Sequence, residues 1–153
     1  MRLILIRHAK AEKYGTKKDF HRKLAEKGVK QCENLKPKLE ALDLKGVEVH
    51  YSASKRTTET FKNIASVLHV NSKKSSQELY HASTNELLTY IWNCDCKAET
   101  LLLIGHNPGI SSLCSYFLDE DMYFKTAEGA VIDFELDSFN ELSKGTGILI
   151  HKL

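Results

Sequence analysis

A short apolar run ends in two basic side chains near the start of the chain, where residues 2–9 read Arg2-Leu3-Ile4-Leu5-Ile6-Arg7-His8-Ala9. The four consecutive aliphatic residues, two of them β-branched, predict a strand that is buried on both faces. Arg7 and His8 follow directly, where such a strand leaves the core. In open parallel sheets, this carboxyl end of the strands is where ligands bind. Both side chains are therefore candidates for a functional site.

A second apolar run repeats this form much later in the chain, where residues 100–107 read Thr100-Leu101-Leu102-Leu103-Ile104-Gly105-His106-Asn107. Here too a histidine follows the strand directly. If the two strands are parallel neighbours, His8 and His106 face one pocket. The alternative for each histidine is an ordinary position in a loop or in the core, which is the commoner role of a single histidine after a strand.

Length and composition predict one soluble globular domain over residues 1–153. The chain has 42% hydrophobic and 27% charged residues, and its length is sufficient for a substantial core. A net charge of +2 is too small to indicate a nucleic-acid or membrane-surface partner. The apolar run before Arg7 is too short for a signal peptide or a transmembrane span. We therefore expect a cytoplasmic protein; the oligomeric state stays open.

The cysteines do not predict a disulfide framework or a metal site in a chain of this size. They are Cys32, Cys94, Cys96 and Cys114. Cys94-x-Cys96 could be half of a metal site, but no second pair at ligand spacing accompanies it. Free thiols in a reducing compartment are the expected state.

Hydrophobic periodicity predicts strands that alternate with helices, which is typical of a three-layer αβα sandwich. A charged loop is expected over residues 10–23, and a helix over 26–42 that Pro37 bends or interrupts. Further expected elements are a strand over 47–51, a helix capped by a serine after it, polar turns over 71–76, a short strand over 78–80, a helix opened by a capping box at 83–86, a helix after 107–109, and a hairpin of strands 130–136 and 146–153. The sheet is expected to be mainly parallel, with at least one antiparallel strand near the C-terminus.

Arg56 adds a second guanidinium group to the predicted pocket. It lies in Ser52-Ala53-Ser54-Lys55-Arg56-Thr57-Thr58-Glu59-Thr60, which follows a predicted strand and opens a helix. The free N–H groups and the positive dipole end of a helix N-terminus attract anions. Arg22, at the end of the charged loop, could fold back over the mouth of the same pocket.

Two guanidinium groups and two imidazoles around one cavity favour a phosphoryl ligand. Arginine binds planar or tetrahedral oxyanions through paired hydrogen bonds. A neutral imidazole can attack phosphorus, and a second, protonated imidazole can stabilise the charge on the equatorial oxygens. A metal site is the competing interpretation. It is disfavoured because no carboxylate follows at ligand spacing and because Arg7 and Arg56 would repel a divalent cation.

Four ordered motifs resemble those of the histidine phosphatase (phosphoglycerate mutase-like) superfamily, over nearly the whole chain. Arg7-His8-Ala9 resembles its Arg-His-Gly signature, and residues 20–28 resemble its Arg-Pro-Leu-Thr-x-x-Gly segment. Residues 52–60 resemble its Ser-Pro-x-x-Arg-x-x-x-Thr segment, and residues 103–109 are similar to the Gly-His-Asn-Pro-Gly of the short SixA-like phosphohistidine phosphatases. The departures are Ala9 for glycine, Lys23 and Ala53 for two prolines, and Ala25 for threonine.

The resemblance implies a role for each matched residue. His8 would be the nucleophile that becomes phosphohistidine, and Arg7, Arg56 and His106 would hold the phosphoryl oxygens. Arg22 and Asn107 would be further substrate contacts. Two in-line transfers, first to His8 and then to water, would need no metal or other cofactor, because the arginines supply the positive charge.

The motifs do not identify the residue that would protonate the leaving group. Family members that cleave phosphate esters place an acid after the second helix, where this chain has His81, with Glu78 close by. The alternative is that both are surface residues. Because imidazole is a better leaving group than an alkoxide, the lack of a carboxylate here favours phosphohistidine substrates, carried by a partner protein. A general phosphomonoesterase and a non-catalytic phosphate-binding module remain alternatives, although a pure binder has no need of His8.

Overall fold

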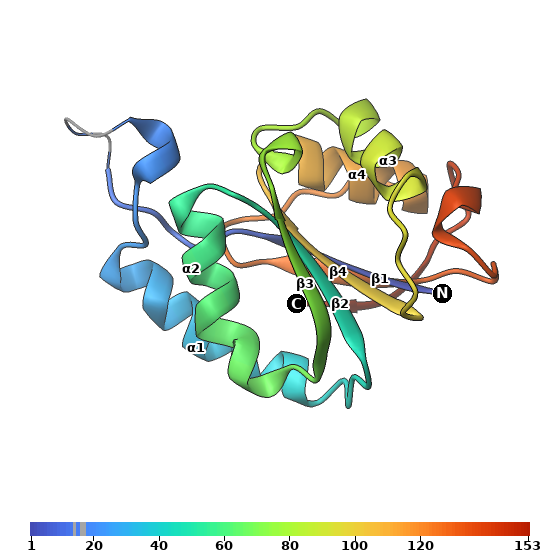
Figure 1. Ribbon diagram of the computed structural model, residues 1–153, viewed down its shortest axis with the longest axis horizontal. Helices are drawn as coiled ribbons and strands as arrows, with labels where there is room; N and C mark the ends of the chain where they lie inside the picture. Colours follow the sequence, from blue (N-terminus) through green and yellow to red (C-terminus); the bar gives the residue numbers. More distant parts are fainter. Residues whose placement is uncertain (14, 16–17) are drawn as a thin grey trace.

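The computed structural model describes residues 1–13, 15 and 18–153 (Figure 1). The loop expected over residues 10–23 includes Tyr14, Thr16 and Lys17, which lie outside the described residues. Within the described part of this segment, a short 3-10 helix η1 covers Asp19–His21. This helix brings the carboxylate of Asp19 to His81.

The strands of the described chain form one six-stranded sheet in the order β3-β2-β4-β1-β5-β6. They are β1 (Arg2–Arg7), β2 (Val47–Ser52), β3 (Val70–Ser76), β4 (Thr100–Gly105), β5 (Gly129–Asp133) and β6 (Ile148–Lys152). β1 pairs with β4, and β2 pairs with both β3 and β4, all in parallel. β5 is antiparallel to β1 and to β6, which confirms the mainly parallel sheet with an antiparallel strand near the C-terminus.

Helices cover both faces of the sheet and form the outer layers of an αβα sandwich. They are α1 (Glu26–Glu40), α2 (Lys55–Ile64), α3 (Thr84–Trp92) and α4 (Gly109–Leu118), with 3-10 helices η2 (Ala65–Val67), η3 (Gln77–Leu79) and η4 (Phe139–Glu141). Figure 1 shows α1 and α2 on one side of the sheet and α3 and α4 on the other. In the described chain, no helix is both long and apolar enough to span a bilayer.

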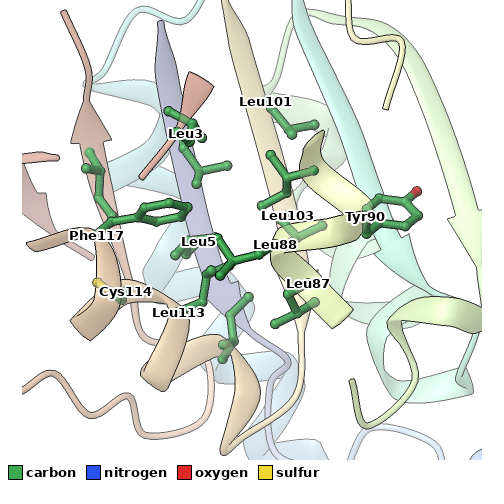
Figure 2. Close-up of a cluster of buried hydrophobic side chains, with 14 of the residues drawn as sticks. Leu3, Leu5, Leu87, Leu88, Tyr90, Leu101, Leu103, Leu113, Cys114 and Phe117 are labelled. Carbon is green, nitrogen blue, oxygen red and sulfur yellow. The ribbon is translucent and has the colours of Figure 1, made fainter. Parts of the chain in front are cut away.

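The alternating side chains of β1 divide the core into two clusters. Leu3 and Leu5 pack with α3 and α4 in one cluster (Figure 2), whereas Ile4 and Ile6 pack with α1 and α2 in the other. All four side chains have no exposed surface. Successive residues of a strand point to opposite faces, so an uninterrupted apolar run is what a strand covered on both sides requires.

Two local predictions are wrong, and of the bend or interruption expected at Pro37 the structure excludes the interruption. Helix α1 continues through Pro37 to Glu40; its buried Cys32, Leu35 and Leu39 hold it against the sheet despite the hydrogen bond that proline removes. The polar stretch expected as turns is strand β3, because an edge strand can pair with β2 and leave its side chains exposed. The short strand expected over residues 78–80 is instead η3 and the turn after it.

Two cap predictions have different outcomes. The capping box of α3 is present, with the Ser83 side chain accepting from the backbone of Glu86 and the Glu86 side chain accepting from the backbone of Ser83. At α2 the N-cap is Ser54, but its side chain makes no capping hydrogen bond. The Ser54 hydroxyl instead contacts the Thr57 hydroxyl at 2.8 Å.

Candidate active site

The two strand-end histidines lie side by side because their strands are parallel neighbours in register. Arg7 at the end of β1 pairs with Gly105 at the end of β4, so the next residue of each strand leaves the sheet at the same level. The ring centroids of His8 and His106 are 5.0 Å apart. Both side chains are buried, as expected for groups that face a pocket inside the fold.

Arg56 joins the histidines from the first turn of α2, which follows the neighbouring strand β2. Its side chain is only 1% exposed, and a buried charge is stable only when it is well hydrogen-bonded. Its Nε donates to Nε2 of His8 at 3.1 Å, and its Nη2 lies 3.2 Å from Nδ1 of His106. The guanidinium group therefore connects the two imidazoles.

The hydrogen bonds of His8 determine which ring nitrogen faces the cavity. Nδ1 lies 2.8 Å from the carbonyl oxygen of Ala9. Because a carbonyl only accepts, Nδ1 carries the proton, and the lone pair of Nε2 accepts from Arg56. Burial, with the charges of Arg56, Arg7 and Arg22, lowers the pKa of His8 to about 3. His8 is thus a neutral imidazole whose basic nitrogen points into the site.

The ring of His106 is held the other way round from that of His8, with Nδ1 rather than Nε2 facing Arg56. Its Nε2 lies 2.9 Å from the Ser52 hydroxyl, while its Nδ1 accepts from Arg56. Burial is the largest cause that lowers the pKa of His106 to about 2, followed by repulsion from His8 and Arg56. His106 is therefore a neutral imidazole in this structure and orients the guanidinium group of Arg56. A proton on His106 remains a prediction for the state with a phosphoryl group bound.

Arg7 carries a buried donor that the described residues do not satisfy. Its Nη1 donates to the carbonyl oxygen of Phe124 at 2.8 Å, but its buried Nε has no hydrogen-bond partner among the described residues. Asn107 also donates to the Phe124 carbonyl, at 2.9 Å, and accepts from the Ser111 hydroxyl. Asn107 thus helps to hold the carbonyl that orients Arg7. A buried unpaired donor is costly, so Nε of Arg7 is suited to bind an anion.

These groups surround one cavity of about 200 Å³, whose lining includes Arg7, His8, Arg56 and His106, the predicted substrate contacts Arg22 and Asn107, and also Asp19 and His81. Larger hollows of about 590 and 990 Å³ lie elsewhere and include neither of the two strand-end histidines in their lining. We identify the smaller cavity as the candidate active site because the reactive groups converge there.

The two candidate proton donors are in different places. His81 lines the site, and its ring centroid lies 4.8 Å from that of His106. Its backbone has a φ of 53°, a left-handed conformation that costs energy for a non-glycine residue. Glu78 lines the separate 590 Å³ hollow, and its side chain accepts from the Ser76 hydroxyl at 3.4 Å, so the structure does not bring it to the candidate site.

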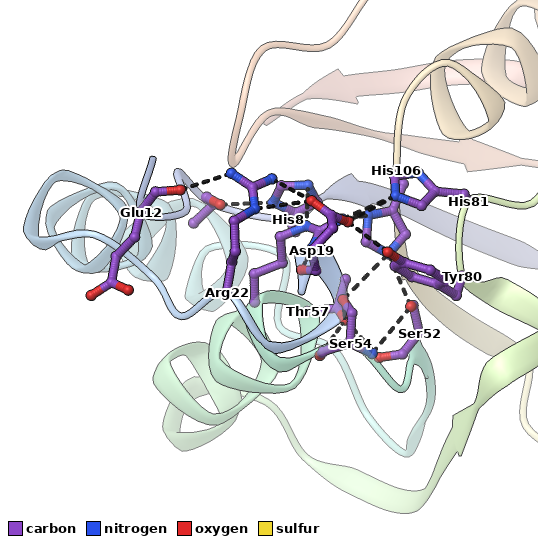
Figure 3. Close-up of polar contacts among 12 residues, drawn as sticks. His8, Glu12, Asp19, Arg22, Ser52, Ser54, Thr57, Tyr80, His81 and His106 are labelled. Carbon is purple, nitrogen blue, oxygen red and sulfur yellow. Dashed lines mark hydrogen bonds and ion pairs between the residues drawn. The ribbon is translucent and has the colours of Figure 1, made fainter. Parts of the chain in front are cut away.

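Asp19 is a site residue that the motifs did not predict (Figure 3). One oxygen of its carboxylate accepts from Nε of Arg22 at 2.9 Å. The other accepts from Arg56 at 3.0 Å and from the Tyr80 hydroxyl at 2.6 Å, and it lies 3.1 Å from Nε2 of His81. The available signal was an isolated acid beside the motif segment that contains Arg22, within a lysine-rich stretch.

The described residues offer no grouping of three or more histidine, cysteine or acidic side chains that could hold a metal ion. The thiol groups of Cys94 and Cys96 donate to the backbone carbonyls of Ile91 and Ala98. At the candidate site, the charged groups beside the histidines are mainly guanidinium groups, which suit an anion.

Comparisons with known proteins agree with this geometry. Residues 3–81 match the model of the histidine phosphatase superfamily (branch 1). The fold is similar to that of two proteins assigned as the phosphohistidine phosphatase SixA. The one from Nakamurella multipartitia has a TM-score of 0.84 and 22% sequence identity, and the alignment covers 99% of this chain and 94% of that chain. The one from Agrobacterium tumefaciens has a TM-score of 0.84 and 23% sequence identity, with coverage of 99% of this chain and 96% of that chain. It is also similar to the protein histidine phosphatase SixA complexed with tungstate (TM-score 0.82, 18% identity, 100% and 96%). No match was found among curated proteins.

Proposed function

The chain belongs to the histidine phosphatase superfamily, branch 1, and from that premise we propose that it hydrolyses phosphohistidine on a partner protein through a phosphoryl group carried by His8. The observation that carries the mechanism is the hydrogen bond from Nδ1 of His8 to the Ala9 carbonyl. It fixes the tautomer in which Nε2 is unprotonated and faces the cavity. A neutral imidazole is the form that can attack phosphorus.

The surrounding cations support phosphoryl transfer. The charge of a phosphoryl group is spread over its equatorial oxygens in the transition state, and preorganised donors stabilise it there. Arg56 and the unpaired Nε of Arg7 provide such donors. A bound dianion also favours a proton on His106, which then adds a further donor. The first transfer forms the bond from Nε2 of His8 to phosphorus, and water breaks that bond in the second.

Phosphohistidine is the favoured substrate because the site is small and the leaving group is easy to expel. A cavity of about 200 Å³ holds a phosphoryl group and little more, so the rest of the substrate remains outside, as it does for a side chain on another protein. A protonated imidazole leaves without the strong general acid that an alkoxide requires. The placement of His81 beside the cavity favours the second candidate, a general phosphomonoesterase, because that imidazole could protonate an alkoxide.

A substrate panel tests these alternatives. We expect kcat/KM to be higher for a phosphohistidine peptide than for alkyl or sugar phosphates, and EDTA to leave each rate unchanged. His81→Ala should slow alkyl phosphate hydrolysis by about 10² to 10⁴ and phosphohistidine hydrolysis much less. A preference for sugar phosphates would identify a general phosphatase. Phosphate binding without turnover of any substrate would identify a binding module.

A further inference from the structure

Asp19 links three segments that are far apart in the sequence. The carboxylate comes from η1, Arg56 from α2, and Tyr80 and His81 from the turn after η3 (Figure 3). The backbone carbonyl of Asp19 also accepts from Nη1 of Arg56 at 2.8 Å. The Asp19 side chain is 17% exposed and the His81 side chain is 50% exposed, so the network runs from the buried Arg56 to solvent at the mouth of the site.

The contact with Asp19 determines which nitrogen of His81 is available for chemistry. A carboxylate only accepts hydrogen bonds, so the proton between the two side chains is on Nε2 of His81, 3.1 Å from Oδ2 of Asp19. Nδ1 of His81 has no hydrogen bond to any described residue and is the nitrogen that can exchange a proton with a substrate. A carboxylate that holds one ring nitrogen while the other moves a proton is the arrangement that orients histidine in serine hydrolases.

Oδ2 of Asp19 contacts both His81 and the guanidinium group of Arg56. Nη2 of Arg56 lies 3.4 Å from Nε2 of His81, and this cation opposes a second positive charge on the imidazole. His106, beside the ring, is neutral because burial lowers its pKa to about 2. Tyr80 is also neutral because burial and its bond to Asp19 raise its pKa.

The remaining charged groups at the cavity are cations. Lys10 and Arg7 line it with Arg22, which is paired with Asp19. Among the described residues that line the cavity, Asp19 is the carboxylate beside these cations.

We propose that Asp19 is a positioning residue that orients the His81 ring, so that the two act as a proton-donor pair for ester substrates; this inference rests on the proposed function. As the bond between phosphorus and the leaving oxygen breaks, Nε2 of His8 bonds to phosphorus and Nδ1 of His81 gives its proton to that oxygen. In the second step the neutral His81 takes a proton from the attacking water. Hydroxide bonds to phosphorus, and His8 leaves as a neutral imidazole.

Two aryl phosphates with the same phosphoryl group separate this role from a structural one. Phenyl phosphate has a poor leaving group that needs a proton, whereas the nitrophenolate of p-nitrophenyl phosphate leaves readily without one. We expect Asp19→Asn to lower kcat for phenyl phosphate by about 10-fold to 100-fold and kcat for p-nitrophenyl phosphate by less than about threefold, with small changes in KM. Because both rates come from one preparation, partial unfolding leaves their ratio unchanged.

A double-variant comparison tests whether Asp19 acts through His81. In a His81→Ala background, Asp19→Asn should cause no further loss on phenyl phosphate, because residues that act as one unit are non-additive. Equal losses on both esters, or additive losses in the double variant, would overturn the proposal and assign Asp19 to the alignment of Arg56. Asp95→Asn is the matched control, since it removes an exposed carboxylate that pairs with Lys97 away from the cavity.

The same measurements distinguish failure of the proposed function from failure of the Asp19–His81 pair. If wild-type protein does not hydrolyse a phosphohistidine peptide, or if His8→Ala retains full activity, the phosphohistidine mechanism is wrong and the pair is wrong with it. If the peptide is hydrolysed through His8 but neither aryl phosphate is, only the proton-donor pair is wrong. If His8-dependent hydrolysis is present but the Asp19→Asn losses are independent of the leaving group, only the proton-donor pair is wrong.

Discussion

His8 and His106 occupy equivalent positions after neighbouring parallel strands, yet their rings are bound in opposite ways. His8 donates from Nδ1 to a backbone carbonyl and presents Nε2 to Arg56. His106 contacts a serine hydroxyl through Nε2 and presents Nδ1 to the same guanidinium group. The same local motif therefore produces two chemical environments, one suited to a nucleophile and the other to a supporting group.

The neighbouring strands explain this difference. β4 pairs with β2, whose last residue Ser52 places a hydroxyl group beside His106. β1 pairs on its other side with β5, which begins at Gly129, where a Cβ would lie 2.1 Å from the carbonyl oxygen of Leu5. Nδ1 of His8 instead bonds to the carbonyl oxygen of Ala9, the next residue in the chain. The neighbouring strand β2 thus supplies the ring partner of His106, whereas His8 finds its partner in its own segment.

Removal of the nucleophile should have the largest effect. His8→Ala is expected to lower kcat by at least about 10⁴, because loss of a nucleophile removes the covalent route. Wild-type protein quenched during turnover should carry an acid-labile, base-stable phosphate on residue 8, detected by mass spectrometry. Circular dichroism of the variant would verify its fold. Label on a serine or cysteine would contradict the assignment.

His106→Ala should be less damaging and should leave the phosphorylated intermediate intact. We expect kcat to fall by about 10² to 10³, as for the loss of one charge-stabilising donor, while label still reaches His8. Rapid-quench measurement of the phosphoenzyme in both variants makes the comparison direct. The opposite pattern, with label retained in His8→Ala and lost in His106→Ala, would reverse the two roles.

The lowered pKa values predict a loss of stability in acid. In the unfolded chain both histidines take up protons near the ordinary value of 6.5, whereas in the folded protein they do so only near 3 and 2. Their contribution to stability is therefore complete above about pH 6.5 and is lost as the pH falls toward 3, by up to about 1.4 kcal/mol per pH unit for each group. Urea unfolding of wild type and His106→Asn at pH 7 and 5 measures this. Parallel pH dependences in the two proteins would contradict the prediction.

Ser52→Ala should have the smallest effect and should act on His106 alone. Loss of the hydroxyl removes the 2.9 Å contact, but the Ser54 hydroxyl at 3.4 Å remains as a weaker partner. We expect kcat to fall by about threefold to tenfold, which corresponds to a typical hydrogen bond of about 1 kcal/mol. Ser75→Ala, on the exposed edge strand β3, is the control. A loss as large as that of His106→Ala would show that Ser52 itself contacts the substrate.

The strand arrangement and the meeting of the histidines could be predicted from local pattern. Uninterrupted apolar runs require strands covered on both faces, and parallel strands bring their carboxyl ends to one edge. The wrong predictions fell where burial gives little signal. β3 is polar because it lies at an edge, and Pro37 is tolerated because the packing of α1 compensates for it.

The sequence by itself determined which residues follow the buried strands, and so it determined the candidate nucleophile and its arginines. Only the tertiary structure decided the tautomers of His8 and His106, the position of Glu78 in another hollow and the presence of Asp19 at the site. The contacts of His106 with Ser52 and of Asp19 with His81 join residues 54 and 62 positions apart. Such hydrogen bonds depend on how separate segments pack, and no periodicity within one segment encodes them.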